Sequence, residues 1–336
     1  MSPRPEPSAA AMMENTPPFT LAHLPPLPPP VHLAIGMFDG IHLGHQKIIR
    51  HATETARATS GTVAVLTFTP HPSHLLHPHA PVPQILNSAD KDELLRALGA
   101  GCIIHEPFTR QFAAHSVGTF LDTLLHALPA LATIHVGEDF RFGHARTGDV
   151  RLLQTHATSR HLRIHSIASV EINGARISST RIRELIATGR VTDANTLLGR
   201  PYASHGTIIP GRALARTLGF PTFNTPWTPE LQPRHGVYAI KVRTPDTPHP
   251  LCGLANYGLR PTVTAETPAH PLLEVHLFTT ATVLANTGLK PGAALHAEWL
   301  HFIRPEKKFP TLDALRAQIT DDVAAAQNFF KSTPIP

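Results

Sequence analysis

The feature that most limits the fold of this chain is a repeated order of apolar run, turn and amphipathic segment that begins at Val31. The run VHLAIGMF predicts a short buried strand, HQKIIRHATETARATS predicts a helix that stops at Gly61, and TVAVLTF predicts a second strand. Strands joined by a helix lie parallel in one sheet. The alternation continues with helices expected at DKDELLRAL, VGTFLDTLLHAL and near DVRLLQTHA, and strands at GCIIHE and ATIHVG. We therefore expect a doubly wound α/β domain with a parallel sheet.

The pattern changes after about Arg200. Extended segments separated by Pro and Gly follow, namely GVYAIKVRT, PLCGLANYG, LLEVHLFTT and ALHAEWLHFIR. They predict a small antiparallel β-barrel. A terminal helix should pack on the barrel through a stripe formed by Leu312, Leu315, Ile319, Val323 and Phe330.

The 336 residues are enough for two domains, each with its own core. We expect a disordered Pro-rich leader over residues 1–30, which ends in PPLPPP, a first domain over 31–199 and a second over 200–331. No internal repeat is visible. The histidine-rich run HPSHLLHPHA suggests either a metal site or a solvated loop, and its prolines and irregular spacing favour the loop.

The net charge of +5 comes mostly from arginine, whose planar fork suits phosphate and carboxylate, although such a charge also serves solubility alone. No long Lys/Arg run marks a nucleic-acid arm, so we expect no nucleic-acid partner. The two cysteines lie far apart, and no apolar run approaches the roughly 18 to 20 residues of a membrane span. The N-terminal stretch lacks the apolar segment of a signal peptide. We expect a cytoplasmic protein without membrane contact, and the sequence predicts no oligomeric state.

The segment GMFDGIHLGHQ stands where the first strand ends and the first helix begins. That place is the usual ligand crevice of an α/β sheet. Its glycines, Gly36, Gly40 and Gly44, allow a ligand to approach the backbone, and the N–H groups of a helix start favour anionic oxygens. The segment predicts a phosphate site.

His42 and His45 are three residues apart, so both rings project to one side if the helix starts near His42. In nucleotidyl transfer the acceptor phosphate attacks the α-phosphorus of ATP directly, and the protein must stabilise charge on the nonbridging oxygens. Two imidazoles can do this. The alternative, two ordinary surface histidines, is disfavoured by the glycine spacing and the strand-to-helix context.

These residues resemble the HxGH signature of the nucleotidyltransferase superfamily, and GxFDGxHxGHQ is similar to its bacterial FAD synthetase branch. TFTPHP (67–72), VGEDFRFGHARTGD (136–149) and ISSTRIRELIATGRVTDANTLLGRPY (177–202) follow in the order seen in bifunctional riboflavin kinase/FMN adenylyltransferases. With the second half, the resemblance covers about residues 31–330. It implies an enzyme that phosphorylates riboflavin to FMN and adenylylates FMN to FAD, with ATP as co-substrate and Mg²⁺ in both steps.

The resemblance assigns ATP binding in the first domain to Gly36, Phe38, Asp39, Gly40, Gln46, Ser178, Ser179, Thr180 and Arg181. The hydroxyls at 178–180 can also simply cap a helix, leaving Arg181 and Arg183 as surface residues. Asp139, Phe140 and Arg141 combine an apolar surface with charge, which suits an isoalloxazine ring and a phosphate, and the resemblance assigns them to the flavin pocket. Phenylalanines at alternating positions are also typical of a sheet core.

In the second half, GTIIPGRALARTLGFPTFN looks like the riboflavin kinase segment with a PTxN motif. Thr222 and Asn224 offer oxygen ligands on one side of an extended segment, where Mg²⁺ can bridge ATP phosphates. The resemblance adds ATP contacts at Gly211, Gly219 and Pro221. In LLEVHLF, Glu274 lies opposite an apolar face and is, by resemblance, the base that takes the proton from the ribityl 5′-hydroxyl. A solvated edge-strand residue is the alternative.

One departure concerns the kinase half. The family usually follows its EVH strand with an acidic, Gly-containing turn that ends in Leu-Tyr-Gly, whereas this chain has FTTATVLANTGLKPG. An alternative function is therefore an FMN adenylyltransferase with a degenerate kinase barrel. A further alternative is an RNA-binding or tRNA synthetase-like protein with the HxGH fold, but no interleaving of aromatic and basic residues supports it.

Overall fold

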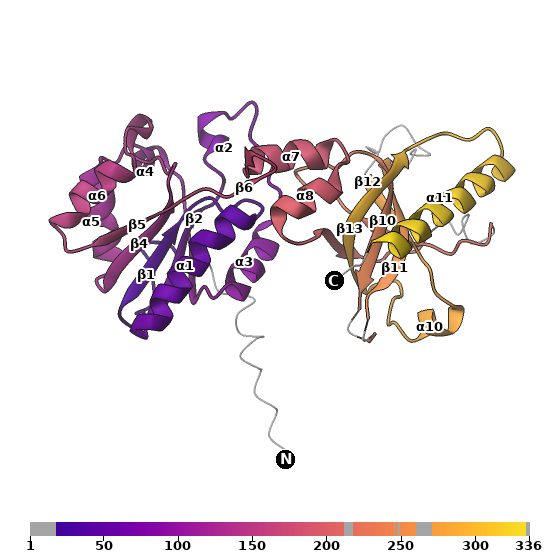
Figure 1. The fold of residues 1–336 in the computed structure, drawn as a ribbon, viewed down its shortest axis with the longest axis horizontal. Helices are drawn as coiled ribbons and strands as arrows, with labels where there is room; N and C mark the ends of the chain where they lie inside the picture. Colours follow the sequence, from indigo (N-terminus) through magenta and orange to yellow (C-terminus); the bar gives the residue numbers. More distant parts are fainter. Residues whose placement is uncertain (1–17, 212–217, 245, 248, 260–270, 334–336) are drawn as a thin grey trace, which may run out of the picture. The chain divides into compact units, whose positions relative to one another are not determined.

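We obtained a computed structural model of the chain, which describes residues 18–211, 218–244, 246–247, 249–259 and 271–333 (Figure 1). The chain divides into two compact units: residues 1–82 with 86–176, and residues 83–85 with 177–336. Within the described ranges no helix is both long and apolar enough to cross a lipid bilayer.

The first unit alternates strands and helices in the order that the sequence predicted. Its strands are β1 Val31–Ile35, β2 Thr62–Phe68, β3 Cys102–Glu106, β4 Leu131–Gly137, β5 Arg163–Ile167, β6 Glu171–Ile172 and β7 Ala175–Arg176. Its helices are α1 Leu43–Thr59, α2 Ser73–Leu76, α3 Ser88–Ala97, α4 Arg110–Ala113, α5 Val117–Ala127, the 3-10 turn η1 His144–Arg146 and α6 Val150–Thr158.

Five parallel strands form the central sheet, in the order β3-β2-β1-β4-β5. Successive side chains of β1 point to opposite faces: Leu33 and Ile35 pack with residues of α5 and α6, and Ala34 packs with residues of α1 and α3. Helices therefore cover both faces, as Figure 1 shows, which confirms the predicted doubly wound fold.

The strand order reverses at the middle of this sheet, because β2 and β3 lie on one side of β1 and β4 and β5 on the other. The carboxyl ends of β1 and β4 meet at that switch point, where α/β proteins bind ligands. The loop after β1 begins at Gly36 and the loop after β4 begins at Glu138. The first motif and the GEDFRFG segment therefore leave the sheet at the same edge.

Part of the expected leader, residues 1–17, lies outside the described residues. The sequence assigned Phe19 and Leu21 to the same leader, but they contact the sheet. Phe19 bridges Ile104 of β3 in parallel, and the Leu21 amide donates to Glu106 at 2.8 Å. Leu21 is buried, so apolar contact fixes this part of the chain despite its neighbouring prolines.

The second unit is an antiparallel sheet of six strands in the order β8-β13-β10-β11-β12-β9. Its strands are β8 Tyr202–Thr207, β9 Phe223–Pro226, β10 Gly236–Arg243, β11 Leu251–Leu259, β12 Pro271–Leu277 and β13 Ala294–Pro305; its helices are α7 Ser179–Ala187, α8 Val191–Leu198, α10 Ala281–Ala285 and α11 Leu312–Ser332. The outer strands approach each other so closely that a Cβ at Gly206 of β8 would overlap Thr225 of β9. The sheet is therefore a nearly closed barrel, as predicted.

Helix α11 packs on the barrel through Ala326, Val323 and its terminal phenylalanines, against Val237 and Leu254. This confirms the predicted terminal helix. Leu312, expected in the same stripe, is instead 56% exposed. Leu312 is the first residue of α11, so it matches the helical spacing of the stripe but lies at the end of the helix.

The compact units divide between Arg176 and Ile177, whereas the sequence predicted a boundary between residues 199 and 200. Helix α8 belongs to the barrel unit: Asn195 Nδ2 donates to the Trp299 carbonyl at 2.7 Å, and its Oδ1 accepts from the Tyr202 amide at 2.7 Å. Where the two catalytic domains begin and end stays a prediction.

A fragment of residues 177–336 should be more stable than one of residues 200–336. The shorter fragment loses the Asn195 bonds, each worth about 1 kcal/mol, and the buried apolar face of α8. Both tryptophans, Trp227 and Trp299, lie in this unit, so urea unfolding followed by fluorescence reports on it. We expect a lower urea midpoint for the shorter fragment. Equal midpoints would contradict the assignment of α8 to the barrel unit.

A cluster of histidines lies between α1 and the sheet. His135 of β4 contacts His51 of α1, with Nδ1 atoms 2.9 Å apart, and stacks on His165 of β5 at 4.7 Å between ring centroids. Its Nε2 lies 2.7 Å from the Thr133 hydroxyl, which also contacts His32 of β1. Burial, followed by the charges of His165, His51 and His32, lowers the pKa of His135 to about 3.

The first unit should lose stability as the pH falls from 7 to 5. A histidine whose folded pKa lies below the unfolded value of about 6.5 binds more protons when unfolded, so its contribution is present above pH 6.5 and is lost below it. For His135 alone, the 1.5 pH units between about 6.5 and 5 lower the free energy of unfolding by roughly 2 kcal/mol. Burial also lowers the pKa of His32 and His165, which adds to the effect.

Urea curves at pH 7 and pH 5 test this, read by a hydrogen-exchange pulse at one common pH and mass spectrometry of β1 and β4 peptides. His135→Gln should unfold with a smaller difference between the two pH values. An unchanged wild-type midpoint, or the same pH difference in the variant, would show that other groups govern acid unfolding.

Candidate functional site

The loop after β1 has an unusual backbone. Gly40 has φ +80°, which suits glycine, but Phe38 and Ile41 also have positive φ, at +50° and +40°. At Gly44 glycine is favoured for steric reasons and not for its backbone conformation. A Cβ there would lie 3.1 Å from Cε1 of His42. The glycine in HLGH therefore leaves room for the histidine ring.

The two histidines of this motif lie face to face. His42 is the N-cap of the 17-residue helix α1, and its Nδ1 accepts from the His45 amide at 3.3 Å. The rings stack with centroids 3.7 Å apart at 17°. Accepting through Nδ1 places the proton of a neutral His42 on Nε2. Both rings thus lie on one side at a helix N-terminus, the geometry that the spacing predicted.

The other residues of this loop that the sequence assigned to nucleotide binding are largely buried. The Phe38 side chain is fully buried, so only its backbone can contact a ligand. Asp39 is 2% exposed, and the buried Gln46 donates to the Ile41 carbonyl at 3.0 Å. Gln46 therefore stabilises the loop. The nucleotide roles of these residues stay predictions.

An apolar pocket of about 400 Å³ opens beside Gly36. Phe140 and Arg141 line it, and Phe140 stacks on Phe142 at 5.2 Å. Asp139, which the sequence placed with them, does not line the pocket and instead pairs with Arg176. Arg141 pairs with Asp149 at 3.3 Å, and both are well exposed.

Several aromatic residues of this pocket were not predicted from the sequence. Phe68, Phe108, Phe112 and Phe120 come from separate elements and contact one another in series. The segment TFTPHP carries two of the lining residues, Phe68 and His71, and was the available signal in the sequence. The rest of the histidine-rich run after it is mostly exposed, as expected of a solvated loop, although α2 forms one turn within it.

The hydroxyl-rich segment at 178–180 begins helix α7. Ser178 is the N-cap, and its Oγ accepts from the Arg181 amide at 3.2 Å, which confirms the predicted cap. Arg183 donates through Nε to the Pro83 carbonyl at 2.9 Å, so its fork is partly engaged within the second unit. The motif at Gly36 belongs to the other unit, and a joint role with Ser178, Ser179, Thr180 and Arg181 stays a prediction.

A second pocket, of about 350 Å³, lies on the barrel beside α11. Glu274 of β12 is the direct cross-strand partner of Asn224 of β9, and Thr222 lines the same pocket. The alternation in β12 is as predicted: Leu273 and Val275 are buried, and Glu274 lies on the other face. The residues that the sequence proposed for base and metal ligands are therefore brought together.

Asn224 is well suited to hold a cation. Its side chain is 3% exposed, and its Oδ1 has no hydrogen-bond partner among the described residues. A Cβ at Gly211 would overlap the Asn224 amide, so glycine lets these two residues approach closely. Gly219 has φ +92°, and the Pro221 carbonyl lies 2.9 Å from Nδ1 of His276. Residues 212–217 of the same motif lie outside the described residues.

The sequence did not predict several charged residues that also line this pocket. Arg304 binds Asp322 of α11 with two bonds of 2.7 Å, and Glu306 and Lys307 lie beside them. The signal was the run RPEKKF, which is dense in charge for a chain with 16% charged residues. The segment that departs from the family turn forms the short helix α10, capped by Thr280.

Comparisons with known proteins cover both units. The family models for FAD synthetase and riboflavin kinase match residues 25–181 and 198–330. A bifunctional riboflavin kinase/FMN adenylyltransferase from Haemophilus influenzae is 36% identical over 301 residues, which is 89% of this chain and 94% of that protein. This chain belongs to the bifunctional riboflavin kinase/FMN adenylyltransferase family.

Other members of the bifunctional riboflavin kinase/FMN adenylyltransferase family are similar over nearly the same length. Those from Escherichia coli and Bacillus subtilis are 36% and 33% identical, over 90% and 89% of this chain and 93% and 92% of theirs. A crystal structure described as a macrolide-efflux protein from Streptococcus pneumoniae has a TM-score of 0.80 and 28% identity, covering 92% of this chain and 97% of that one. This solved structure therefore has the same fold as our chain over nearly its whole length.

Proposed function

We propose that the two activities of the family are carried by two separate pockets of this chain. The chain phosphorylates riboflavin to FMN with ATP, releasing ADP, and adenylylates FMN to FAD with ATP, releasing pyrophosphate. The first reaction is assigned to the barrel pocket and the second to the Gly36–Gln46 loop. The direct pairing of Glu274 with Asn224 in one pocket is the strongest support for the kinase assignment.

In adenylyl transfer, a phosphate oxygen of FMN attacks the α-phosphorus of ATP, and the bond to the pyrophosphate breaks. The enzyme needs no nucleophile of its own, so its residues have to bind, orient and stabilise charge. Stacked His42 and His45, with the N-terminus of α1, are suited to the nonbridging oxygens. We assign the triphosphate to Gly36, Gly40, Ser178, Ser179, Thr180 and Arg181.

The aromatic pocket beside Gly36 is assigned to the flavin of the FMN substrate. Phe140 and Phe142 offer stacked rings for the isoalloxazine, and Arg141 lies next to them with a charge for the phosphate. Gly36 lines the same pocket, which brings a flavin there next to the nucleotide loop.

In the kinase pocket we assign Glu274 as the general base. It takes the proton from the ribityl 5′-hydroxyl as that oxygen attacks the γ-phosphorus of ATP and ADP leaves. We assign ATP contacts to Gly211, Gly219 and Pro221.

Kinases and adenylyltransferases that use ATP generally need a divalent metal ion, and we propose Mg²⁺ here. Thr222 and the unsatisfied Oδ1 of Asn224 would hold it, since hard oxygen ligands suit Mg²⁺. Bound there, it would neutralise charge on the ATP phosphates. A cytoplasmic location stays an expectation from the sequence.

The purified chain should convert riboflavin, ATP and Mg²⁺ first to FMN and then to FAD, and chromatography of the flavins separates the products. Riboflavin-dependent release of ADP distinguishes this from an adenylyltransferase with a degenerate barrel. FAD formation from FMN without any FMN formation from riboflavin would show that the barrel has no kinase activity.

A further inference from the structure

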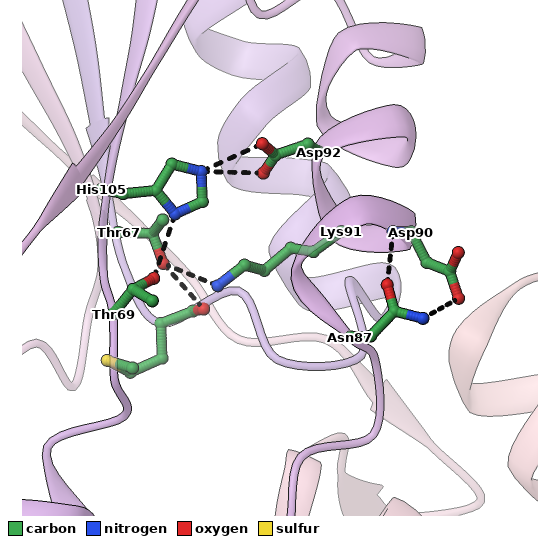
Figure 2. Close-up of polar contacts among 8 residues, drawn as sticks. Thr67, Thr69, Asn87, Asp90, Lys91, Asp92 and His105 are labelled. Carbon is green, nitrogen blue, oxygen red and sulfur yellow. Dashed lines mark hydrogen bonds and ion pairs between the residues drawn. The ribbon is translucent and has the colours of Figure 1, made fainter. Parts of the chain in front are cut away.

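Lys91 is a buried lysine that the reaction assigned above does not use. It lies in the first turn of α3 and is 7% exposed. Figure 2 shows its side chain directed toward Thr67 of β2, and Nζ donates to the Thr67 hydroxyl at 3.4 Å. A buried ammonium group is costly unless charges or hydrogen bonds compensate it, so its position requires an explanation.

Contacts on both sides of Lys91 fix the start of α3. Asn87, the N-cap, accepts from the Asp90 amide at 2.9 Å and donates to the Asp90 carboxylate at 2.9 Å. Both carboxylate oxygens of Asp92 lie 3.0 Å from Nε2 of His105 on β3 (Figure 2). These contacts fix the helix backbone on either side of Lys91.

Lys91 is linked to the loop after β1 through hydrogen bonds. The Thr67 hydroxyl that accepts from Lys91 donates to the Met37 carbonyl at 3.1 Å. Burial lowers the pKa of Lys91, while the negative charges of Asp92 and, to a smaller extent, Asp39 raise it. Asp39 is itself buried, and an anion beneath a phosphate site needs a compensating cation.

The loop that these contacts reach is strained. Phe38 and Ile41 have positive φ without being glycine, a backbone conformation that is unfavourable for residues with a side chain. Conformations of this kind persist only where the surrounding structure determines them. Lys91 and Thr67 supply such constraints from beneath the loop.

We propose that Lys91 is a positioning residue for adenylyl transfer: through Thr67 it holds the Met37 carbonyl, and its charge balances Asp39, so that the Gly36–Gly40 loop keeps the shape that receives the nucleotide. The inference rests on the proposed adenylyltransferase site. Lys91 does not itself bind substrate, because it is buried and directed at Thr67.

The test uses the full chain with Lys91→Met, which keeps length and removes charge. We expect kcat/KM for ATP in FAD synthesis from FMN to fall about 10- to 100-fold, the scale of a small misplacement of reacting groups. FMN formation from riboflavin, in the other unit, should not change. The matched control is Arg96→Met, which removes an exposed cation from the same helix and should leave both activities unchanged.

A double-mutant cycle with Asp39→Asn separates positioning from general packing. If Lys91 acts by balancing Asp39, Lys91→Met should cost much less in the Asp39→Asn background. Additive losses, or a Lys91→Met variant as active as wild type, would overturn the proposal. If Lys91→Met does not fold, Thr67→Val decides: a several-fold loss of FAD synthesis supports the link to Met37, and full activity overturns it. Wild type that forms no FAD would instead overturn the proposed function, and the inference with it.

Discussion

His45→Ala should lower FAD formation from FMN about 10²- to 10³-fold, the scale of losing one preorganised donor in an active site. His45 stacks on His42 at the N-terminus of α1, so its removal takes a donor from the position that we propose for the α-phosphate. FMN formation from riboflavin should hardly change, because the barrel carries that reaction. Both rates are measured on the same preparation by separating FMN and FAD.

His79→Ala is the matched control, since His79 is an exposed histidine of the same unit. It should leave FAD formation at the wild-type rate. A parallel fall of both activities in His45→Ala would indicate unfolding rather than loss of a catalytic group. Survival of FAD synthesis would remove His45 from the mechanism.

Glu274→Gln should lower riboflavin phosphorylation about 10²- to 10⁴-fold, the usual contribution of a general base. The amide preserves the shape of the side chain opposite Asn224 but cannot accept the proton, so riboflavin binding should change little. FAD formation from added FMN should persist. The measurement is ADP release under saturating riboflavin, with flavin binding followed separately.

Glu306→Gln is the informative comparison, because Glu306 is another carboxylate in the same pocket. Asp322 is a poorer candidate, since both of its oxygens bind Arg304. Full kinase activity in Glu274→Gln together with its loss in Glu306→Gln would reassign the base. An inactive wild-type kinase would instead make Glu274 only a strand residue.

The sequence predicted correctly those structural features that depend on residues close to one another along the chain. The strand, glycine turn and helix around Gly36, the cap at Ser178 and the alternation around Glu274 each depend on residues close in sequence. Leu312 shows the limit of periodicity, because it matches the helix stripe but lies beyond the surface that the stripe covers.

Residues that are brought together only by long-range packing could not be predicted. Arg304 and Asp322 meet across a strand and a helix, and the phenylalanines around Gly36 come from separate elements. Lys91 resembles an ordinary surface lysine in DKDELLRAL. Only the packing of α3 against β2 and β3 shows that it is buried.

The close approach of β8 and β9 at Gly206 also bears on the exposure of the sheet edges. An open sheet offers its outermost backbone N–H and C=O groups as a template for a strand of another molecule. Here the outer strands face each other, and the absent side chain at Gly206 lets Thr225 come near enough to shield both edges. A larger residue at this position would meet Thr225 and push the two outer strands apart. The absence of a side chain at Gly206 thus helps to leave few edge groups open to a strand of another molecule.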